Sequence, residues 1–154
     1  MWLLFVTVIV FNVLFIFMPK RLTSIEFFST CMFAMVLQQI VDLAFDLKLD
    51  WYGYFAPGVQ WWYFLVIVGI YPAVNAIFLN YYQWMKSRAM KCWYIGGWSV
   101  FAVVYEWLAV KAGYFYHHEW KLWLSAIMYP PLYLILLWVL KLVRKLVHNS
   151  VPVA

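Results

Sequence analysis

Charged residues are confined to short segments of this chain, and long uncharged stretches lie between them. Lys, Arg, Asp and Glu are all absent from 1–18, 27–41, 51–85 and 122–140. An apolar helix of about 20 residues matches the hydrocarbon thickness of a bilayer, and a soluble domain of this length does not need so much apolar surface. The pattern therefore predicts an integral membrane protein built from helices.

The uncharged stretches resolve into five predicted transmembrane helices in a single domain, 1–154. We place them at about 2–18, 27–47, 60–80, 93–112 and 121–141, with each end uncertain by a few residues. The predicted fold class is thus all-α, an integral membrane bundle of five helices. The first helix lacks a preceding basic segment and a following small-residue cleavage site, so we interpret it as a retained helix rather than a secretion signal.

Lys and Arg are unevenly distributed over the predicted connections. Eight of them lie in the first connection, the third connection and the C-terminal tail: Lys20, Arg21, Lys86, Arg88, Lys91, Lys141, Arg144 and Lys145. The remaining three are Lys48, Lys111 and Lys121, in the second and fourth connections. Because cytoplasmic loops carry the excess of basic residues, we predict the N-terminus outside and the C-terminus in the cytoplasm.

Composition favours a membrane protein over a nucleic-acid-binding one. Apolar residues form 68% of the chain and charged residues 11%, against about a half and a quarter in soluble proteins. The net charge of +5 suits a cytoplasmic face that lies against anionic lipid. A nucleic-acid groove needs a soluble basic surface, which this pattern does not provide. The predicted partner is the lipid bilayer, and a second copy of the chain or a partner membrane protein is a further candidate.

Three acidic residues fall within predicted spans, where a charge is energetically expensive. Asp42 and Asp46 are one helical turn apart and share a face with Gln38, and Glu106 lies on the fourth span. A charge at that depth must face the bundle interior and find a partner. One interpretation is an outward-opening polar site for a proton, a cation or a cationic solute. The other is structural, with the acids paired to lysines: Lys48, Lys111 or Lys121.

Asparagines lie in the same spans. Asn12 and Asn75 occupy the first and third helices, where an amide can hydrogen-bond to a neighbouring helix. We include Asn75 in the candidate polar site with Gln38 and the three acids. Asn80, near the end of the third span, is predicted to cap a helix.

The two outward connections share a short pattern. Asp46 precedes Gly53-Tyr54-Phe55 by seven residues and Glu106 precedes Gly113-Tyr114-Phe115 by seven, an offset of 60 in both cases. Prolines are predicted to break the helices that follow: Pro72 in the first unit, Pro130-Pro131 in the second. Two parallel repeats related by an axis along the membrane normal would explain the pattern. The alternative is a chance match between aromatic-rich loops.

The chain contains no recognisable catalytic motif, so we predict a protein that is not an enzyme and needs no cofactor. Gly96-Gly97 opens no phosphate loop, and the sequence has no H-E-x-x-H or G-x-S-x-G pattern. His117-His118-Glu119 lacks a third spaced ligand, so no metal site is predicted. Cys31 and Cys92 are expected to be reduced thiols that pack between helices.

Several short motifs in a fixed order give the chain a resemblance. They are Met18-Pro19-Lys20-Arg21, Tyr52-Gly53-Tyr54-Phe55-Ala56-Pro57-Gly58, Asn75 with Phe78-Leu79-Asn80, Tyr105-Glu106, and Gly113-Tyr114-Phe115-Tyr116 with Trp120-Lys121. The set resembles a family of small multi-pass membrane proteins of Bacillus-like and Clostridium-like spore-forming bacteria. This resemblance implies a bacterial plasma membrane. It implies no activity and supplies no catalytic residues, and Pro130-Pro131 is not part of the pattern.

The predicted function is non-enzymatic. We expect a sensor, accessory or interaction subunit of the cell membrane whose outer polar cavity contains Asp42, Asp46 and Glu106. The main alternative is a transporter of a small solute or a cation, in which proton binding to the acids has a part. A lipid-modifying enzyme at the outer surface is the third option.

Overall fold

The computed structural model describes residues 2–55 and 61–150 and is 79% helical. Its helices are α1 (Trp2–Phe17), α2 (Ser24–Asp42), which continues as the π-helix η1 (Leu43–Lys48), α3 (Trp62–Gly69), α4 (Tyr71–Tyr82), α5 (Arg88–Lys111) and α6 (Leu122–Ser150). Because α2 runs into η1 and α3 is followed directly by α4, these segments form five helical rods. Each rod overlaps a predicted span, and α6 extends nine residues beyond the predicted end at 141.

Three of the rods are long and apolar enough to cross a membrane: Ser24–Lys48, Trp62–Tyr82 and Leu122–Ser150. The helix Trp2–Phe17 is apolar but shorter. Large apolar side chains cover the outside of the bundle, and Trp2, Phe17, Trp61 and Trp93 are 71 to 86% exposed. Such a surface suits lipid rather than water. The prediction of a mostly helical chain with helices long and apolar enough to span a membrane is confirmed.

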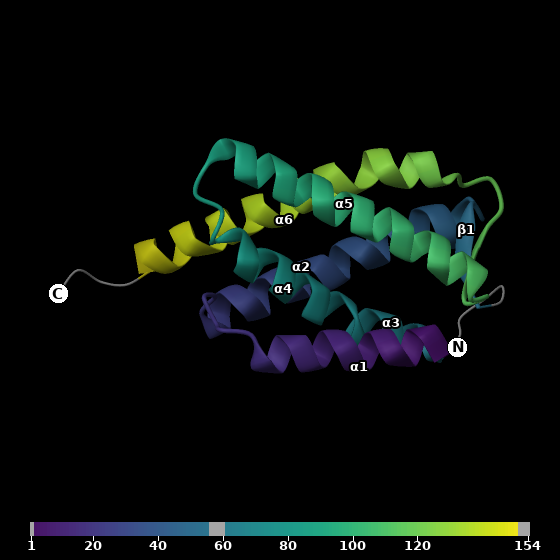
Figure 1. Cartoon of the computed structure of the whole chain (residues 1–154), viewed down its shortest axis with the longest axis horizontal. Helices are drawn as coiled ribbons and strands as arrows, with labels where there is room; N and C mark the ends of the chain where they lie inside the picture. The colour runs from purple at the N-terminus through teal and green to yellow at the C-terminus, as the bar shows by residue number, and fades with distance from the viewer. Residues whose placement is uncertain (1, 56–60, 151–154) are drawn as a thin grey trace.

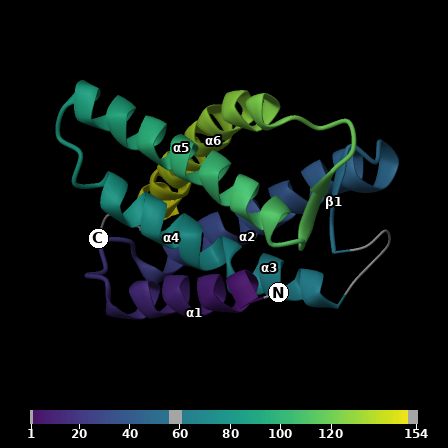
Figure 2. The same cartoon turned by 45° about the vertical axis from the view of Figure 1, so that its right-hand side comes forward.

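Helix α4 lies at the centre of the bundle. It contacts α1, α2, α5 and α6, and in Figures 1 and 2 it runs between α1 and α5. Phe78 and Leu79 of α4 are fully buried and pack against Tyr133, Leu136 and Leu140 of α6. The connections 18–23 and 83–87 lie at the same end of the bundle as the C-terminal part of α6.

A short β-ribbon closes the opposite end of the bundle, where the sequence predicted only loops. Strand β1 (Tyr52–Tyr54) pairs antiparallel with β2 (Phe115–His117), with Tyr52 opposite His117 and Tyr54 opposite Phe115. The amide of Phe55 also donates to the carbonyl of Tyr114 at 3.0 Å. The two Gly-Tyr-Phe motifs therefore lie against each other, and the prediction of an all-α bundle is wrong at this ribbon.

The predicted proline breaks have opposite outcomes. At Pro72 the prediction is confirmed, because α3 ends at Gly69 and α4 begins at Tyr71. The Gly69 carbonyl at this break accepts a 2.7 Å hydrogen bond from the Asn12 side chain of α1, which confirms the cross-helix role of Asn12. Helix α6 runs unbroken through Pro130 and Pro131, so the second break was a wrong prediction. The fixed φ of proline is itself helical, and the long segments on both sides hold α6 together.

Asn80 does not cap a helix, contrary to prediction. It is fully buried and fastens the connection 18–23: its Oδ1 accepts from the Arg21 amide at 2.7 Å, and its Nδ2 donates to the Pro19 carbonyl at 2.8 Å. Helix α4 continues past it to Tyr82. The buried amide therefore holds two segments that are about sixty residues apart in sequence.

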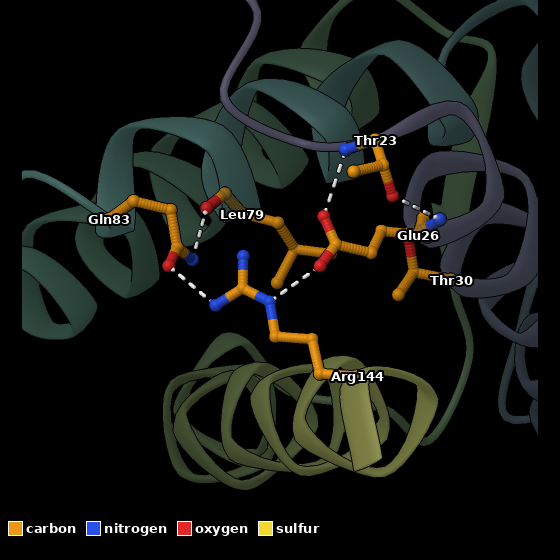
Figure 3. A network of polar contacts seen from close by, with 6 residues as sticks. All are labelled: Thr23, Glu26, Thr30, Leu79, Gln83 and Arg144. Carbon is orange, nitrogen blue, oxygen red and sulfur yellow. Dashed lines mark hydrogen bonds and ion pairs between the residues drawn. The ribbon is translucent and has the colours of Figure 1, made fainter. Parts of the chain in front are cut away.

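A polar network beside this connection joins α2, α4 and α6 (Figure 3). Glu26 and its N-cap Thr23 form a capping box, in which Glu26 Oε2 accepts from the Thr23 amide at 2.9 Å. Arg144 Nε donates to Glu26 Oε1 at 2.6 Å, and its Nη1 donates to Gln83 Oε1 at 2.9 Å. The single buried carboxylate at this end is thus neutralised by a guanidinium group.

Candidate functional site

Asp42 lies where the α-helix α2 becomes the wider π-helix η1, a type of irregularity that is frequent at functional sites. Its side chain is almost completely buried. Oδ1 accepts hydrogen bonds from Gln38 Nε2 and from the Tyr52 hydroxyl, both at 2.8 Å, and the Tyr63 hydroxyl bonds to Oδ2. The carboxylate is therefore held by three uncharged groups from α2, β1 and α3.

Glu106 occupies the corresponding place on α5 and is also buried. Its Oε1 accepts from Ser125 Oγ at 2.7 Å and lies 2.8 Å from His117 Nε2, and its Oε2 accepts from the Tyr129 hydroxyl at 2.6 Å. Trp120 Nε1 in turn donates to Ser125 Oγ at 2.7 Å. These groups come from α5, β2, α6 and the segment between the last two.

The two acid clusters share one plan. Each acid sits on a helix that leads to the ribbon, takes one contact from the ribbon and takes another from a tyrosine on the next helix. The ribbon contacts, Tyr52 and His117, are directly opposite each other in the sheet register. This arrangement matches Glu106 with Asp42, whereas the sequence pattern matched it with Asp46. The ribbon therefore connects the two clusters.

Among the described residues neither acid is paired with a lysine, so the predicted pairing with Lys48, Lys111 or Lys121 is wrong. In the described parts of the chain the ion pairs are His117–Glu106, His118–Asp50 and Arg144–Glu26. None of them involves Lys48, Lys111 or Lys121. Asp42 is bonded to neutral groups alone, and Glu106 has a cationic neighbour only when His117 is protonated.

A cavity of about 240 Å³ lies in the bundle beneath the ribbon. Glu106 and Ser125 line it, together with Gln38 of α2, Tyr52 and Tyr54 of β1, and aromatic residues of α4, α5 and α6. At about 30 Å³ per molecule this space equals about eight waters. A mostly apolar cavity with a few converging polar groups is the usual form of a small-molecule site.

Asn75 of α4 lines the same cavity and is 7% exposed. No described residue makes a hydrogen bond to its side chain, so the predicted cross-helix bond of Asn75 is not formed. Every fully buried side-chain nitrogen or oxygen of the described residues has a hydrogen-bond partner. Because the Asn75 amide has no such partner, it is not fully enclosed and borders open space inside the bundle. Asn75 is a buried polar group with free hydrogen-bonding capacity at the cavity.

Of the three acids predicted in the cavity, Glu106 lines it, whereas Asp42 and Asp46 do not. Asp42 is buried beside the cavity, and Asp46 lies apart from it. Asp46 is half-buried on η1 and packs against the ribbon, where its Oδ1 is 3.0 Å from the point that a Cβ on Gly53 would occupy. The Tyr116 hydroxyl would be only 2.4 Å from the same point. Gly53 is therefore required for the close approach of Tyr116 to the backbone.

Tyrosine hydroxyls near the ribbon remain protonated at neutral pH. Burial, and after it the charge of Asp42, raises the pKa of Tyr52 well above its usual range. Burial and the hydrogen bond to Tyr105 raise the pKa of Tyr114 in the same direction. These groups therefore act as hydrogen-bond donors to the carboxylates and to each other.

The sequence did not reveal most of the groups that hold the acids. Tyr52, Tyr63, Ser125, Tyr129 and His117 are not among the predicted site residues. One signal is present in the sequence: Ser125 and Tyr129 are four residues apart and so share a helix face. His117 and His118 point to different acids, and the described residues hold no metal-binding group of three or more His, Cys, Asp or Glu.

Comparison of the chain with family models, curated proteins and solved structures gives no match. The resemblance to small membrane proteins of spore-forming bacteria therefore stays a prediction. The site must be interpreted from its own chemistry.

Proposed function

We propose that the chain is a five-span protein of the bacterial plasma membrane, with its N-terminus outside and its C-terminus in the cytoplasm. The surface belt of apolar residues supports this proposal, as does the gathering of the Lys- and Arg-rich connections at one end. Helix α5 has 24 residues, long enough to cross a bilayer, although it is rich in Trp and Tyr. The ribbon then lies at the outer face.

Its function in this proposal is to bind a proton or a small cationic solute in the cavity beneath the ribbon, as a sensor or an accessory subunit. The observation that carries the proposal is the contrast between the buried acids. Glu26 is neutralised by Arg144, whereas Asp42 and Glu106 face the bundle interior without a lysine or arginine partner. A buried carboxylate without a permanently charged partner makes the interior attractive to a positive charge.

A transporter is the second candidate, and one observation favours it. The break between α3 and α4 lies at Gly69–Pro72, and residues on both sides of it, Val66 and Tyr71, line the cavity. Interrupted helices beside a central site are typical of transporters. Flux across proteoliposomes separates the candidates, because a sensor or accessory subunit binds the cation without moving it.

The proposal is tested on purified protein in nanodiscs by calorimetric titration with ammonium, methylated ammonium, Na⁺ and K⁺ salts, and by infrared difference spectra of the carboxyl groups against pH. Wild type is compared with Glu106→Gln. Asp50→Asn is the control, since Asp50 is an exposed carboxylate beside a histidine at the same end. We expect cation or proton binding that Glu106→Gln abolishes and Asp50→Asn leaves intact. Binding of no cation, together with no proton uptake assignable to Glu106 or Asp42, would show that the proposal is wrong.

A further inference from the structure

Aromatic rings form a large part of the wall of the cavity. Eleven of its lining residues are Phe, Tyr or Trp, and they come from α1, α4, α5, α6, both strands and the segment before α6. Several of their hydroxyls are already occupied. Tyr114 donates to Tyr105 at 2.6 Å, and the hydroxyls of Tyr54 and Tyr71 are 3.2 Å apart. The wall therefore offers π-electrons more than free donors or acceptors.

The carboxylate in this wall is also largely occupied. A carboxylate has about four lone-pair directions, and Glu106 already has contacts with Ser125, His117 and Tyr129 in three of them. A protonated primary amine carries three N–H donors that need acceptors inside the cavity. A quaternary ammonium carries none, and needs only a negative charge and aromatic faces, which is the way that aromatic cages recognise such cations.

We infer that the cavity binds the quaternary ammonium group of a small N-methylated solute or headgroup, with Glu106 as the counter-charge and the tyrosine rings as the cage. This inference rests on the proposed function and narrows its cationic ligand to one chemical class. Asn75 supplies the further polar contact, because its buried amide borders the cavity with no described partner. It suits a hydroxyl or carbonyl oxygen of the same ligand.

Other cations fit the cavity less well. A bare metal ion needs several oxygen or nitrogen ligands at short distance, and the described residues hold no group of three or more His, Cys, Asp or Glu that could supply them. A proton alone does not explain about 240 Å³ of aromatic space or the free amide of Asn75. A trimethylammonium group fills part of that space and loses little in leaving water, because its surface is mostly methyl groups.

The test is calorimetric titration of the full chain in nanodiscs of phosphatidylglycerol with four probes. The probes are tetramethylammonium, choline, ethanolamine and 3,3-dimethylbutan-1-ol, the uncharged isostere of choline. We expect choline to bind at least about tenfold more tightly than ethanolamine, and the isostere not to bind. Repeating the choline titration in phosphatidylcholine nanodiscs identifies the source: loss of binding indicates that a lipid headgroup occupies the cavity, and unchanged binding indicates a free solute.

Paired variants test the two parts of the cage. Glu106→Gln should weaken choline binding by at least about tenfold, while the control Asp50→Asn should not change it. Tyr71→Phe keeps the ring and should bind normally, whereas Tyr71→Leu removes it and should weaken binding roughly 3- to 30-fold. Tyr71→Phe and Tyr71→Leu leave Glu106 and its hydrogen-bonding partners in place. They therefore remain informative even if Glu106→Gln fails to fold.

The outcomes separate this inference from the proposed function. Equal or tighter binding of ethanolamine overturns the quaternary class and leaves a cation-binding protein. Equal binding of the uncharged isostere overturns both, because the carboxylates are then irrelevant. Binding of none of the probes, with retained proton uptake at Glu106, overturns the inference alone. Equal choline affinity of Tyr71→Phe and Tyr71→Leu shows that the rings form no cage.

Discussion

The two ends of the bundle bury carboxylates in opposite ways. Away from the ribbon, Glu26 caps its own helix and is bound by Arg144 from the far end of the chain (Figure 3). Beneath the ribbon, Asp42 and Glu106 are held by tyrosines, a serine, a glutamine and a histidine. An acid that only fastens helices is best neutralised inside the protein. The ribbon end supplies neither a lysine nor an arginine to its two acids, and the proposed function rests on this difference.

The comparison between the two ends requires that the ribbon end face outward. Reporter fusions test this orientation directly, and each fusion gives an all-or-none result. A reporter fused after Ala154 should be active in the cytoplasm, and one inserted at the exposed residue Glu119 should be active outside. Ala56, an alternative insertion site predicted from the sequence to be external, lies outside the described residues. Reversed activities at both positions would place the acid cavity on the cytoplasmic side.

Arg144→Gln should produce the largest loss of stability. The substitution leaves the Glu26 carboxylate, 10% exposed, without its guanidinium. Losing a hydrogen bond to a charged group costs about 1.5 to 3 kcal/mol, and the partial exposure of Arg144 places the expected loss near 2 kcal/mol. Thermal unfolding in detergent measures it, with the exposed neighbour Lys145→Gln as the control. An equal effect of both variants would remove the structural role assigned to Glu26.

Gly113→Ala should destabilise the ribbon end by about 1 to 2 kcal/mol. Gly113 has φ +75°, a left-handed conformation that costs a residue with a Cβ about this much. Gly96→Ala is the matched control, because nothing lies within 4 Å of the added Cβ and its helical backbone accepts alanine. Unfolding midpoints of the two variants give the comparison. A loss for Gly96→Ala as large as that for Gly113→Ala would contradict the assigned backbone strain.

Alkaline pH should weaken the ribbon end specifically. The pKa of Tyr52 is raised above its ordinary value of 10.0, so the folded state keeps a proton that the unfolded state loses. The contribution of the Tyr52 proton to the free energy of unfolding is therefore complete below about pH 10. It decreases as the pH rises, and about 1.4 kcal/mol of it is lost at pH 11. Tyr52→Phe should show a correspondingly shallower decline in stability between pH 9 and 11. Identical slopes for the variant and wild type would show that Tyr52 is not shielded by burial and Asp42.

Glu106→Gln should have the smallest effect on stability, below about 1 kcal/mol in either direction. Glutamine keeps most of the hydrogen bonds, and removing a buried charge that has no lysine or arginine partner offsets the loss. Glu26→Gln is the informative counterpart, since it removes one half of an ion pair and should destabilise by more. If Glu106→Gln unfolds the protein while Glu26→Gln is tolerated, the contrast between the two ends is reversed.

The helices were predictable because apolar length alone specifies them. The third span, predicted at 60–80, is observed as Trp62–Tyr82. The last span, predicted at 121–141, extends to Ser150, because Lys141, Arg144 and Lys145 are as compatible with a helix as the apolar residues before them. The ribbon was not predicted, since strands of three residues leave no period in the sequence. Asp42, Glu106 and Gln38 were found because a polar residue stands out in an apolar span. Their tyrosine partners were not, because in a chain that is 23% aromatic one more tyrosine carries no signal.

The pairing of Tyr52 with His117 has a mechanical consequence. These two residues hold different acids, yet they face each other across one antiparallel ribbon only three residues long. A strand that shifts along its partner must pull both side chains away from their carboxylates together. The ribbon is therefore the part of the backbone that the two hydrogen-bonding clusters share.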